Sequence, residues 1–468
     1  MLQLIVLMLI VLVNAALAVI APIKTLIVGG GPGGLLTAHA LLSRYKQGQY
    51  TYDCEVVEAR EDPRLEVEPG ARAYSLGLNI RGQTALKYFD KPGRCFGLYH
   101  SVETEGVFSE SFFLHLGTTK LQIRKPAKSN AKSAPPPTLM LPRSRLASAM
   151  IGKAEQLYGE RFKCKFNTRV NSVDLSTRRA TLSDGTVFTY DLLIGADGIN
   201  SEVRKALKGL GEDVFRSEEV RLPGMYKVMV QDCPPSLESG AIHAMSSSAK
   251  NSSGFGLFVI PAPANKVCTL VTWKDESNTP TVLQDGVASS VGKLQAAIAN
   301  DFPLFGMPSK AAIEQLSLQA PSIAMTVKCN EYAVPDRGVL LLGDSAHSTG
   351  GTLGQGANSA LLDAVALDKI LDAKDDNIFL SLGEYSKLQQ PEGTSLWKLL
   401  QLPPKGPWGV LYQLEQLLRG VFNKLLPWIF AAKPMQNALS QSLTPFTVIV
   451  KQNAFWVWLA NRGKAQVI

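Results

Sequence analysis

A run of glycines between an expected strand and an expected helix constrains this chain more than any other feature. Residues 23–28 are apolar and rich in β-branched side chains, residues 29–34 read Gly-Gly-Gly-Pro-Gly-Gly, and residues 35–42 have the composition of a helix. In this context Gly29 permits the tight turn, Gly31 lets the backbone approach a pyrophosphate, and Gly34 lets the helix pack on the strand. The helix start, which includes Gly33, presents free N–H groups to phosphate oxygens. The segment therefore predicts a Rossmann-type dinucleotide-binding unit.

The second expected strand ends in a carboxylate. Residues 54–57 are mostly apolar, and Glu58 follows them, 24 residues after Gly34. A carboxylate at this place accepts hydrogen bonds from the ribose hydroxyls of an adenosine. We therefore count Glu58, and Arg60 close behind it, among the candidate cofactor-binding residues.

Two later segments each contain a buried strand that ends in a Gly/Asp pair. Residues 190–204 contain Asp197 and Gly198, and residues 338–348 contain Gly343 and Asp344. The second segment leads to the start of a helix that is expected to run to about residue 371, and that start consists of Gly354, Gln355, Gly356, Ala357 and Asn358. The first glycine turn alone does not separate NAD from FAD, whereas the three segments together favour FAD.

These three motifs make residues 23–390 resemble the single-component, class A flavin monooxygenases, and most of all the kynurenine 3-monooxygenases. The resemblance implies that Asp344 accepts a hydrogen bond from a ribityl hydroxyl. It implies that the helix opened by residues 354–357 points its positive end at the flavin pyrimidine ring, with Asn358 beside that ring. It also implies that Asp197, Gly198 and Arg204 lie on the flavin side of the site.

Two arginine-containing segments extend the resemblance. Residues 72–86 and 139–146 follow patterns of the kynurenine 3-monooxygenases, in which Arg72 would contact the FAD phosphates or ribose and Arg143 would start a helix beside the FAD. The chain departs from those enzymes near the expected substrate. Phe112 stands near the position of a substrate-binding Arg, residues 116–142 contain no Tyr, and the loop after His347 lacks the usual Pro. The usual bidentate Arg clamp for a substrate carboxylate is thus missing.

The expected fold class is α/β, with a Rossmann-like, GR2-type FAD-binding domain, a β-sheet substrate domain and a helical, apolar C-terminal segment. The FAD-binding domain is expected from residues 23–105, 140–205 and 326–390. Residues 206–325 would form the substrate domain, whose sheet would cover the flavin ring. Residues 125–137, which are polar and Pro-rich, would form a mobile insertion.

The resemblance implies that NADPH or NADH reduces the FAD, and that a flavin C4a-hydroperoxide hydroxylates an aromatic small molecule. No catalytic side chain and no metal are expected, because the chemistry belongs to the flavin and dioxygen. We interpret His347 as structural, since it follows the Gly-Asp turn and no carboxylate is expected to orient it. Two alternatives stay open: epoxidation, reduction or cyclisation of a membrane lipid or isoprenoid, and a flavin-binding protein without turnover.

Both ends of the chain are apolar. Residues 2–21 carry no charge, and an Ala16-Leu17-Ala18 pattern makes a cleaved signal peptide or a retained membrane anchor the two interpretations of residues 1–21. Residues 391–468 predict apolar helices, either a cap on the catalytic domain or a membrane-surface pair. The expected location is therefore membrane-associated, or an organelle or the secretory pathway. The net charge of +8 fits anionic lipid or dinucleotide partners, and no nucleic-acid motif is present. The six cysteines, none in a CxxC, predict scattered thiols.

Overall fold

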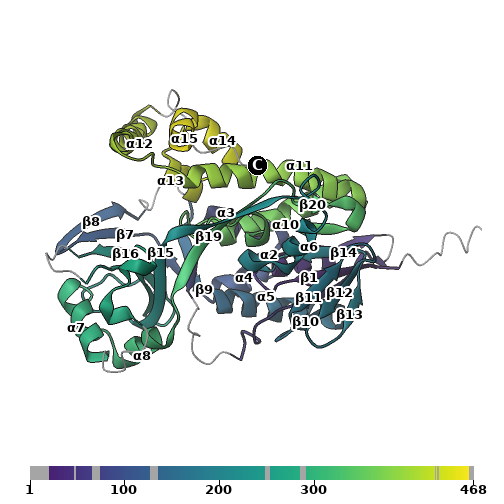
Figure 1. Cartoon of the computed structure of the whole chain (residues 1–468), viewed down its shortest axis with the longest axis horizontal. Helices are drawn as coiled ribbons and strands as arrows, with labels where there is room; N and C mark the ends of the chain where they lie inside the picture. Colours follow the sequence, from purple (N-terminus) through teal and green to yellow (C-terminus); the bar gives the residue numbers. More distant parts are fainter. Residues whose placement is uncertain are drawn as a thin grey trace, which may run out of the picture.

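A computed structural model describes residues 21–46, 49–65, 74–126, 135–247, 253–284, 291–426, 428 and 432–462. Two large sheets organise them (Figure 1). The first has six strands in the order β10 (Phe162–Lys165), β4 (Tyr52–Val57), β1 (Ile23–Val28), β14 (Leu192–Gly195), β21 (Val339–Leu341) and β20 (Ala333–Val334). The first five are parallel, and only β20 runs antiparallel to its neighbour.

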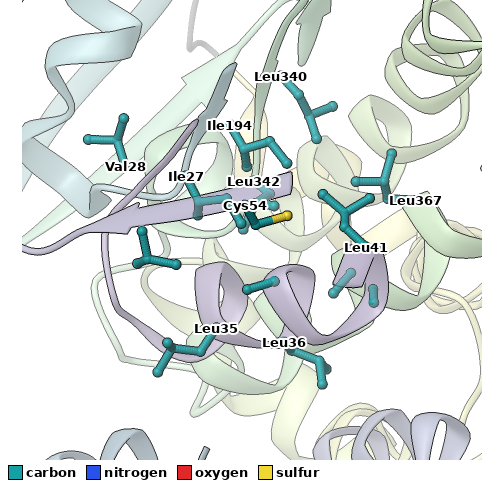
Figure 2. Packing of buried hydrophobic residues seen from close by; sticks show 14 of the residues in the cluster. Ile27, Val28, Leu35, Leu36, Leu41, Cys54, Ile194, Leu340, Leu342 and Leu367 are labelled. Carbon is teal, nitrogen blue, oxygen red and sulfur yellow. The ribbon is translucent and has the colours of Figure 1, made fainter. Parts of the chain in front are cut away.

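The central strands of the six-stranded sheet are apolar along their length because helices cover them. Ile27 pairs with Ile194, and Ile194 pairs with Leu340, so that the three side chains form a row across β1, β14 and β21. Figure 2 shows this row, with Leu41 of α2 and Leu367 of α10 beside it. These residues belong to the largest buried cluster of the molecule, so the strand and helix expected from residues 23–42 are confirmed.

Helix α2 (Pro32–Leu42) packs against β4, α5 and α10. The other helices before the C-terminal region are α3 (Ile80–Phe89), α4 (Leu98–Glu103), α5 (Arg143–Tyr158), α6 (Glu202–Lys208), α7 (Val291–Asp301), α8 (Lys310–Leu318), α9 (Asp344–His347) and α10 (Gly356–Ala373). The helix expected after Gly354 is thus α10. Helix α10 contacts both α2, which follows the glycine turn, and α3.

The second large sheet has seven strands. Their order is β19 (Ser322–Cys329), β15 (Ser217–Asp232), β18 (Lys266–Trp273), β17 (Gly256–Ala262), β16 (Ile242–Ser246), β7 (Phe112–Leu116) and β8 (Thr119–Arg124). The strands expected from the middle of the chain are present, but β7 and β8 join them from an earlier part of the sequence. The expected boundary between residues 325 and 326 falls inside β19.

The two faces of the seven-stranded sheet have different neighbours. One face packs on α7 and α8 through a cluster that includes Met229, Val271 and Ile298. The other face packs on Met140 of β9 through Val228 and Ile260. That strand belongs to a small sheet of β5 (Ser75–Leu78), β9 (Thr138–Pro142) and β6 (Val107–Ser109). The second face of the large sheet is therefore turned toward the FAD-binding part of the chain.

Two peripheral sheets complete the strands. They consist of β11 (Val170–Asp174), β12 (Arg179–Leu182) and β13 (Val187–Thr189), and of β2 (Tyr45–Lys46) and β3 (Gln49–Tyr50).

Most of the Pro-rich insertion, the segment of Arg72, and residues 1–20 lie outside the described residues. All six cysteines are free thiols.

The C-terminal region is helical, as expected. Long helix α11 (Ile378–Leu400) crosses the molecule, and the helices that follow lie on its far side from the six-stranded sheet (Figure 1). They are α12 (Pro407–Leu425), α13 (Met435–Ser440), α14 (Phe446–Gln452) and α15 (Ala454–Asn461). Among the described residues, none of the helices combines the length and the hydropathy that a bilayer span requires.

Candidate FAD site

The glycine turn and the DG segment touch through their backbones. Gly29 has a φ of +108°, and a Cβ placed on it would lie 2.3 Å from the carbonyl oxygen of Ala196. A Cβ on Gly34 would lie 2.2 Å from the Gly29 oxygen and 3.1 Å from the Ala196 Cβ. No side chain fits at either position, because such contacts are far inside van der Waals distance. The residue before Asp197 is thus held directly against the first turn.

The GD segment meets the same turn on its other side. A Cβ on Gly33 would lie 2.7 Å from Leu342 Cδ1 and 3.1 Å from the Cβ of Ala360 in α10. Gly343 has a φ of +61°, and a Cβ there would lie 3.0 Å from Ala360 Cβ. The structure therefore brings together all three motifs that the sequence singles out, although they are spread over more than 300 residues.

The start of α2 combines free backbone donors with a nearby cation. Gly31 is the N-cap, and Pro32 occupies the first helical position, where a missing N–H costs nothing. The Nη2 atom of Arg143 lies 3.5 Å from where a Cβ on Gly31 would be. Among the described residues, the Arg143 guanidinium has no hydrogen-bond or ion-pair partner. A helix N-terminus beside an unpaired arginine fits a phosphate group.

Glu58 is tied to the glycine turn. Its Oε2 accepts a hydrogen bond of 2.7 Å from the Gly30 N–H, and its Oε1 accepts one of 3.0 Å from the Arg60 N–H. The backbone of Arg60 thus fixes the carboxylate that is predicted to meet the ribose. Each carboxylate oxygen has a second lone pair, so Glu58 can still accept from ribose hydroxyls.

Asp197 holds the DG segment and keeps one oxygen unused. Its Oδ2 accepts hydrogen bonds from the N–H groups of Glu202 (2.7 Å) and Val203 (3.3 Å) at the start of α6. Its Oδ1 is buried with no hydrogen-bond partner among the described residues. Burial raises the pKa of this carboxyl, because desolvation disfavours its charged form. Next to it, Gly198 has a φ of +76° and open space around its Cα. An orphaned buried acceptor beside an open glycine fits a bound polar ligand.

Arg204 joins the DG and GD segments. Its guanidinium donates to the carbonyl oxygens of Gly198 (3.5 Å), Ile199 and Ser345 (2.9 Å), and it pairs with Glu219 of β15 at 3.0 Å. This arginine is buried, so its charge is satisfied by the protein. Arg204, which the resemblance puts on the flavin side, therefore acts on the site by positioning the two turns.

Asp344 presents its carboxylate at the start of α10. It is exposed and, among the described residues, makes no hydrogen bond or ion pair. Its Oδ1 lies 3.6 Å from where a Cβ on Gly356 would be. Gly354 has a φ of +63° with nothing near its Cα, so the backbone before α10 is open to a ligand. The partly buried Ala357 packs on the main core.

Asn358 and Gln355 connect α10 to β5 and α3. Asn358 Oδ1 accepts from the N–H groups of Asn79 (3.0 Å) and Gly82 (3.2 Å), and its Nδ2 donates to the oxygens of Gly77 (2.9 Å) and Gly354 (3.1 Å). Gln355 Oε1 accepts from Asn79 Nδ2 at 3.4 Å. Asn358 is thus saturated by backbone groups, and its contribution to the site is to fix the start of α10.

The prediction that no carboxylate orients His347 is wrong. His347 Nε2 lies 2.7 Å from Oδ2 of Asp363, which also accepts from the Gly343 N–H at 2.8 Å. Burial by itself lowers the pKa of His347, but the carboxylates of Asp363 and Asp344 outweigh it, and the pKa is raised above its ordinary value. Asp363 was missed, although an acid inside an otherwise apolar helix such as residues 360–367 is a signal for a buried partner.

The face of the seven-stranded sheet that is turned toward this site is apolar. Its side chains include Tyr226, Val228, Phe258, Ile260 and Leu270. At the edge, Phe112 pairs with Arg124 of β8. The Arg124 guanidinium is used by the protein, since it donates to the oxygens of Ser109, Glu110 and Thr138. The nearby arginine therefore does not replace the missing carboxylate clamp.

The residues that the structure describes fit FAD. Unpaired polar groups at Arg143, Asp197 and Asp344 surround glycines that leave the backbone open at positions 31, 198 and 354. Arg72 lies outside the described residues, and its role stays a prediction.

Comparisons with known proteins agree with this arrangement. The family model described as "FAD binding domain" matches residues 22–374. A kynurenine 3-monooxygenase of Salinispora arenicola is 26% identical over 79% of this chain and 76% of its own length. The FAD-dependent monooxygenase ausM of Penicillium brasilianum is 25% identical over 81% and 74% of the two chains. The crystal structure of a 2-methyl-3-hydroxypyridine-5-carboxylic acid oxygenase mutant superposes with a TM-score of 0.60 at 18% identity, over 83% of this chain and 95% of that one. The resemblance to the flavin monooxygenases is thereby confirmed.

Proposed function

Because the chain belongs to the family of FAD binding domain proteins, we propose that it is a monooxygenase that hydroxylates an aromatic small molecule with dioxygen and a reduced nicotinamide. One observation carries the proposal: the glycine turn, the DG segment and the GD segment contact one another and leave unpaired polar groups around open backbone. The similarity to relatives named kynurenine 3-monooxygenase supports the reaction class.

Bound FAD supplies the activation of dioxygen and the transfer of oxygen. The chain's own residues bind and orient it. Arg143 and the start of α2 bind the phosphates, Glu58 accepts from the ribose, and Asp344 accepts from a ribityl hydroxyl. The start of α10 stabilises negative charge on the ring system through its free N–H groups, because a helix N-terminus carries a partial positive charge.

The sheet face over the site excludes water and selects the substrate. Tyr226, Phe258 and Leu270 present apolar and aromatic surface to the FAD-binding part. Aromatic side chains bind a flat ring well, because offset and edge-to-face ring contacts add to the hydrophobic gain. A dry site also protects the reactive oxygen species from water. These features support a substrate that is an apolar ring.

The same face supports a second candidate function, the oxidation of a lipid or isoprenoid. The guanidinium of Arg124 is bound to three protein oxygens, and Phe112 stands beside it. A substrate that needs no carboxylate clamp suits this edge better than an amino acid does. The two candidates differ only in substrate, and one assay separates them.

The test starts from the purified full chain. Its absorbance spectrum and the flavin released by heat should identify FAD. Consumption of NADPH and of NADH is then followed together with oxygen uptake, with aromatic amino acids in one series and isoprenoid lipids in detergent in another. Stimulation by a ring compound, with heavy oxygen from labelled dioxygen in the product, is the expected result. Stimulation by lipid alone would support the second candidate.

Two controls make the outcome decisive. The same mixture without dioxygen should reduce the flavin but form no product. A protein that binds FAD and never accepts electrons from either nicotinamide would be a flavin-binding protein without turnover. A folded protein that stays colourless, and whose melting temperature FAD does not raise, would contradict both candidate functions.

A further inference from the structure

Helix α12 has a polar stripe, which includes Gln416 and Arg419, and this stripe faces the neighbouring C-terminal segments. Gln416 Oε1 accepts a hydrogen bond of 2.6 Å from the Met435 N–H, and Gln416 Nε2 donates to Oδ1 of Asn453 at 3.3 Å. Arg419 Nη1 donates to the same Asn453 oxygen at 3.2 Å. Tyr412, on the same stripe, is the only buried residue of this helix. The inward contacts of α12 are therefore largely polar.

The opposite stripe of α12 is apolar and exposed. Val410 is 72% exposed, Leu417 is 66% exposed and Leu425 is 65% exposed. Leu414 and Val421 lie between these three residues in the sequence. The five side chains are spaced by four, three, four and four residues, which places them on one side of a helix. Further exposed apolar side chains flank this stripe, namely Trp408, Leu411, Leu418 and Phe422. A helix on a water-facing surface normally has the reverse orientation.

Helix α15 adds exposed aromatic rings beside α12. Phe455 and Trp458 are both more than half exposed, while the neighbouring Trp456 packs edge-on against Tyr412 of α12. The guanidinium of Arg462 lies 5.4 Å from the centre of the Trp458 ring. We call the exposed apolar residues of α12, with Phe455 and Trp458, the α12–α15 face. A contiguous apolar face of this kind marks a surface that binds something.

The charge of this region indicates what it binds. Residues 401–468 contain seven lysines and arginines but a single acid, Glu415, so they carry six of the eight net positive charges of the chain. Lys405, Lys424 and Lys451 are exposed. Lys424 follows Leu417 by seven residues and therefore borders the apolar stripe. Apolar and indole side chains bordered by Lys424 and Arg462 match the interfacial layer of an anionic bilayer.

We propose that the α12–α15 face binds the surface of a bilayer that contains anionic phospholipid, with α12 lying in the plane of the interface. Leucines and indole rings would enter the headgroup region, and the lysines would contact lipid phosphates. A second copy of this chain suits the face less well. A symmetric contact would bring the same basic residues of two copies together, and like charges repel.

Flotation of the full chain with vesicles tests the proposal. We expect the protein to float with vesicles of phosphatidylcholine and phosphatidylglycerol, and to float much less with phosphatidylcholine alone. Leu417→Glu should weaken binding to the anionic vesicles roughly tenfold, since it removes an apolar group that would enter the bilayer and adds a charge of the same sign as the lipid phosphates. Lys424→Glu should weaken it in the anionic vesicles but hardly change the weak binding to neutral ones.

Matched variants at other surfaces serve as controls. Leu318→Glu makes the same change at an 86% exposed leucine, the last residue of α8, and should bind like the unaltered chain. Lys163→Glu, at an exposed lysine of β10, is the control for Lys424→Glu. Because all four positions are exposed, the fold should tolerate these changes, which a melting curve checks.

A second measurement locates the contact. Lipids with brominated acyl chains should quench tryptophan fluorescence in the unaltered chain. The combined change Trp408→Phe, Trp428→Phe and Trp458→Phe, which replaces the exposed tryptophans at and next to the face, should remove most of that quenching. The proposal is overturned if the chain does not bind anionic vesicles. It is also overturned if the chain binds them, Leu417→Glu binds equally well, and the tryptophan changes leave the quenching unaltered. It is also overturned if light scattering shows a dimer that Leu417→Glu converts to a monomer, because a second copy then covers the face.

Discussion

His347 of the GD loop and Asp363 of α10 form a buried pair, with 2.7 Å between His347 Nε2 and Asp363 Oδ2. The same Asp363 oxygen accepts the N–H of Gly343, which immediately precedes Asp344. The pair therefore ties the loop that carries a predicted flavin contact to the helix whose start is predicted to face the flavin. The structural role of His347 stays a prediction, and the structure adds a carboxylate partner that was not expected.

The His347–Asp363 pair should make stability depend on pH. The pKa of His347 is raised in the folded protein, so the pair stabilises the fold fully below the ordinary pKa of histidine. This contribution should fade as the pH rises through the raised pKa. Asp363→Asn should lower the free energy of unfolding by roughly 2 kcal/mol or more at acidic pH, and by less at alkaline pH. Urea unfolding at several pH values measures both.

Asp372→Asn is the control for that experiment. Asp372 lies on the same helix and pairs with Arg44, but its side chain is 60% exposed. Exposed pairs contribute roughly 1 kcal/mol or less. If Asp363→Asn cost no more than Asp372→Asn at every pH, the role given to the buried pair would be wrong.

Arg143→Ala should weaken FAD binding. The guanidinium lies beside Gly31 and has no partner among the described residues, so its removal leaves no buried protein charge unpaired. Loss of one charged hydrogen bond to phosphate corresponds to roughly tenfold or more in the dissociation constant. Quenching of flavin fluorescence during titration gives that constant. Arg145→Ala, an exposed arginine two residues later on α5, should bind FAD normally.

Asp344→Asn should weaken FAD binding without affecting the fold. The carboxylate is exposed and makes no hydrogen bond or ion pair with the described residues, and its charge is only the smaller of the two carboxylate effects that raise the pKa of His347, so the fold should lose little stability. An amide accepts a hydroxyl hydrogen bond less strongly than a carboxylate does, so we expect a roughly fivefold to tenfold rise in the dissociation constant. Asp213→Asn changes an exposed aspartate far along the chain and should have no effect. If the two variants bound FAD equally well, the predicted role of Asp344 in FAD binding would be wrong.

Gly34→Ala and Gly152→Ala should have opposite effects on stability. Both glycines lie in helices. A Cβ on Gly34 would meet backbone at 2.2 Å, whereas a Cβ on Gly152 meets nothing within 4 Å. Alanine at residue 152 should therefore stabilise the protein by about 0.5–1 kcal/mol, through helix propensity alone. Alanine at residue 34 must displace the turn and should lower both the melting temperature and FAD binding. A Gly34→Ala protein as stable as the parent would contradict the observed packing.

A pair of histidines should make the seven-stranded sheet sensitive to acid. His115 Nε2 lies 3.0 Å from His243 Nδ1 across β7 and β16. Burial lowers the pKa of His115 to about 4, and it also lowers the pKa of His243. A lowered pKa in the folded state means that stability is lost as the pH falls from about 6.5 toward 4. His115→Gln should flatten this loss, measured by melting temperature against pH. His100→Gln, at an exposed histidine, should leave the profile unchanged.

Local patterns in the sequence suffice for the elements that approach the cofactor. The strand β1, the glycine turn and α2 follow one another within 20 residues, and glycine at positive φ has few structural alternatives. The strands before Asp197 and Asp344 and the helix α10 are equally apparent, because an apolar run that ends in Gly/Asp is a local signal. The three turns could therefore be singled out, and their meeting could be inferred from the resemblance.

Partners that are distant in the sequence could not be found in this way. Arg204 meets Ser345 across 141 positions, and Asn79 meets Asn358 across 279. Nothing in the residues around Arg204 distinguishes a ligand-binding arginine from one that is buried by protein oxygens. The addition of β7 and β8 to the substrate sheet could not be predicted either, because strand pairing depends on which sheet edges meet in three dimensions.

The sequence by itself determined that this protein has a strand–glycine–helix unit, two Gly/Asp turns and an amphipathic helix near its C-terminus, because backbone sterics and side-chain periodicity are local properties. Only the tertiary structure decided that Asp363 holds His347, that Arg204 is used by the protein, and that α12 turns its polar stripe inward. Periodicity divides a helix into two faces, but contacts with Met435 and Asn453 determine which face is buried.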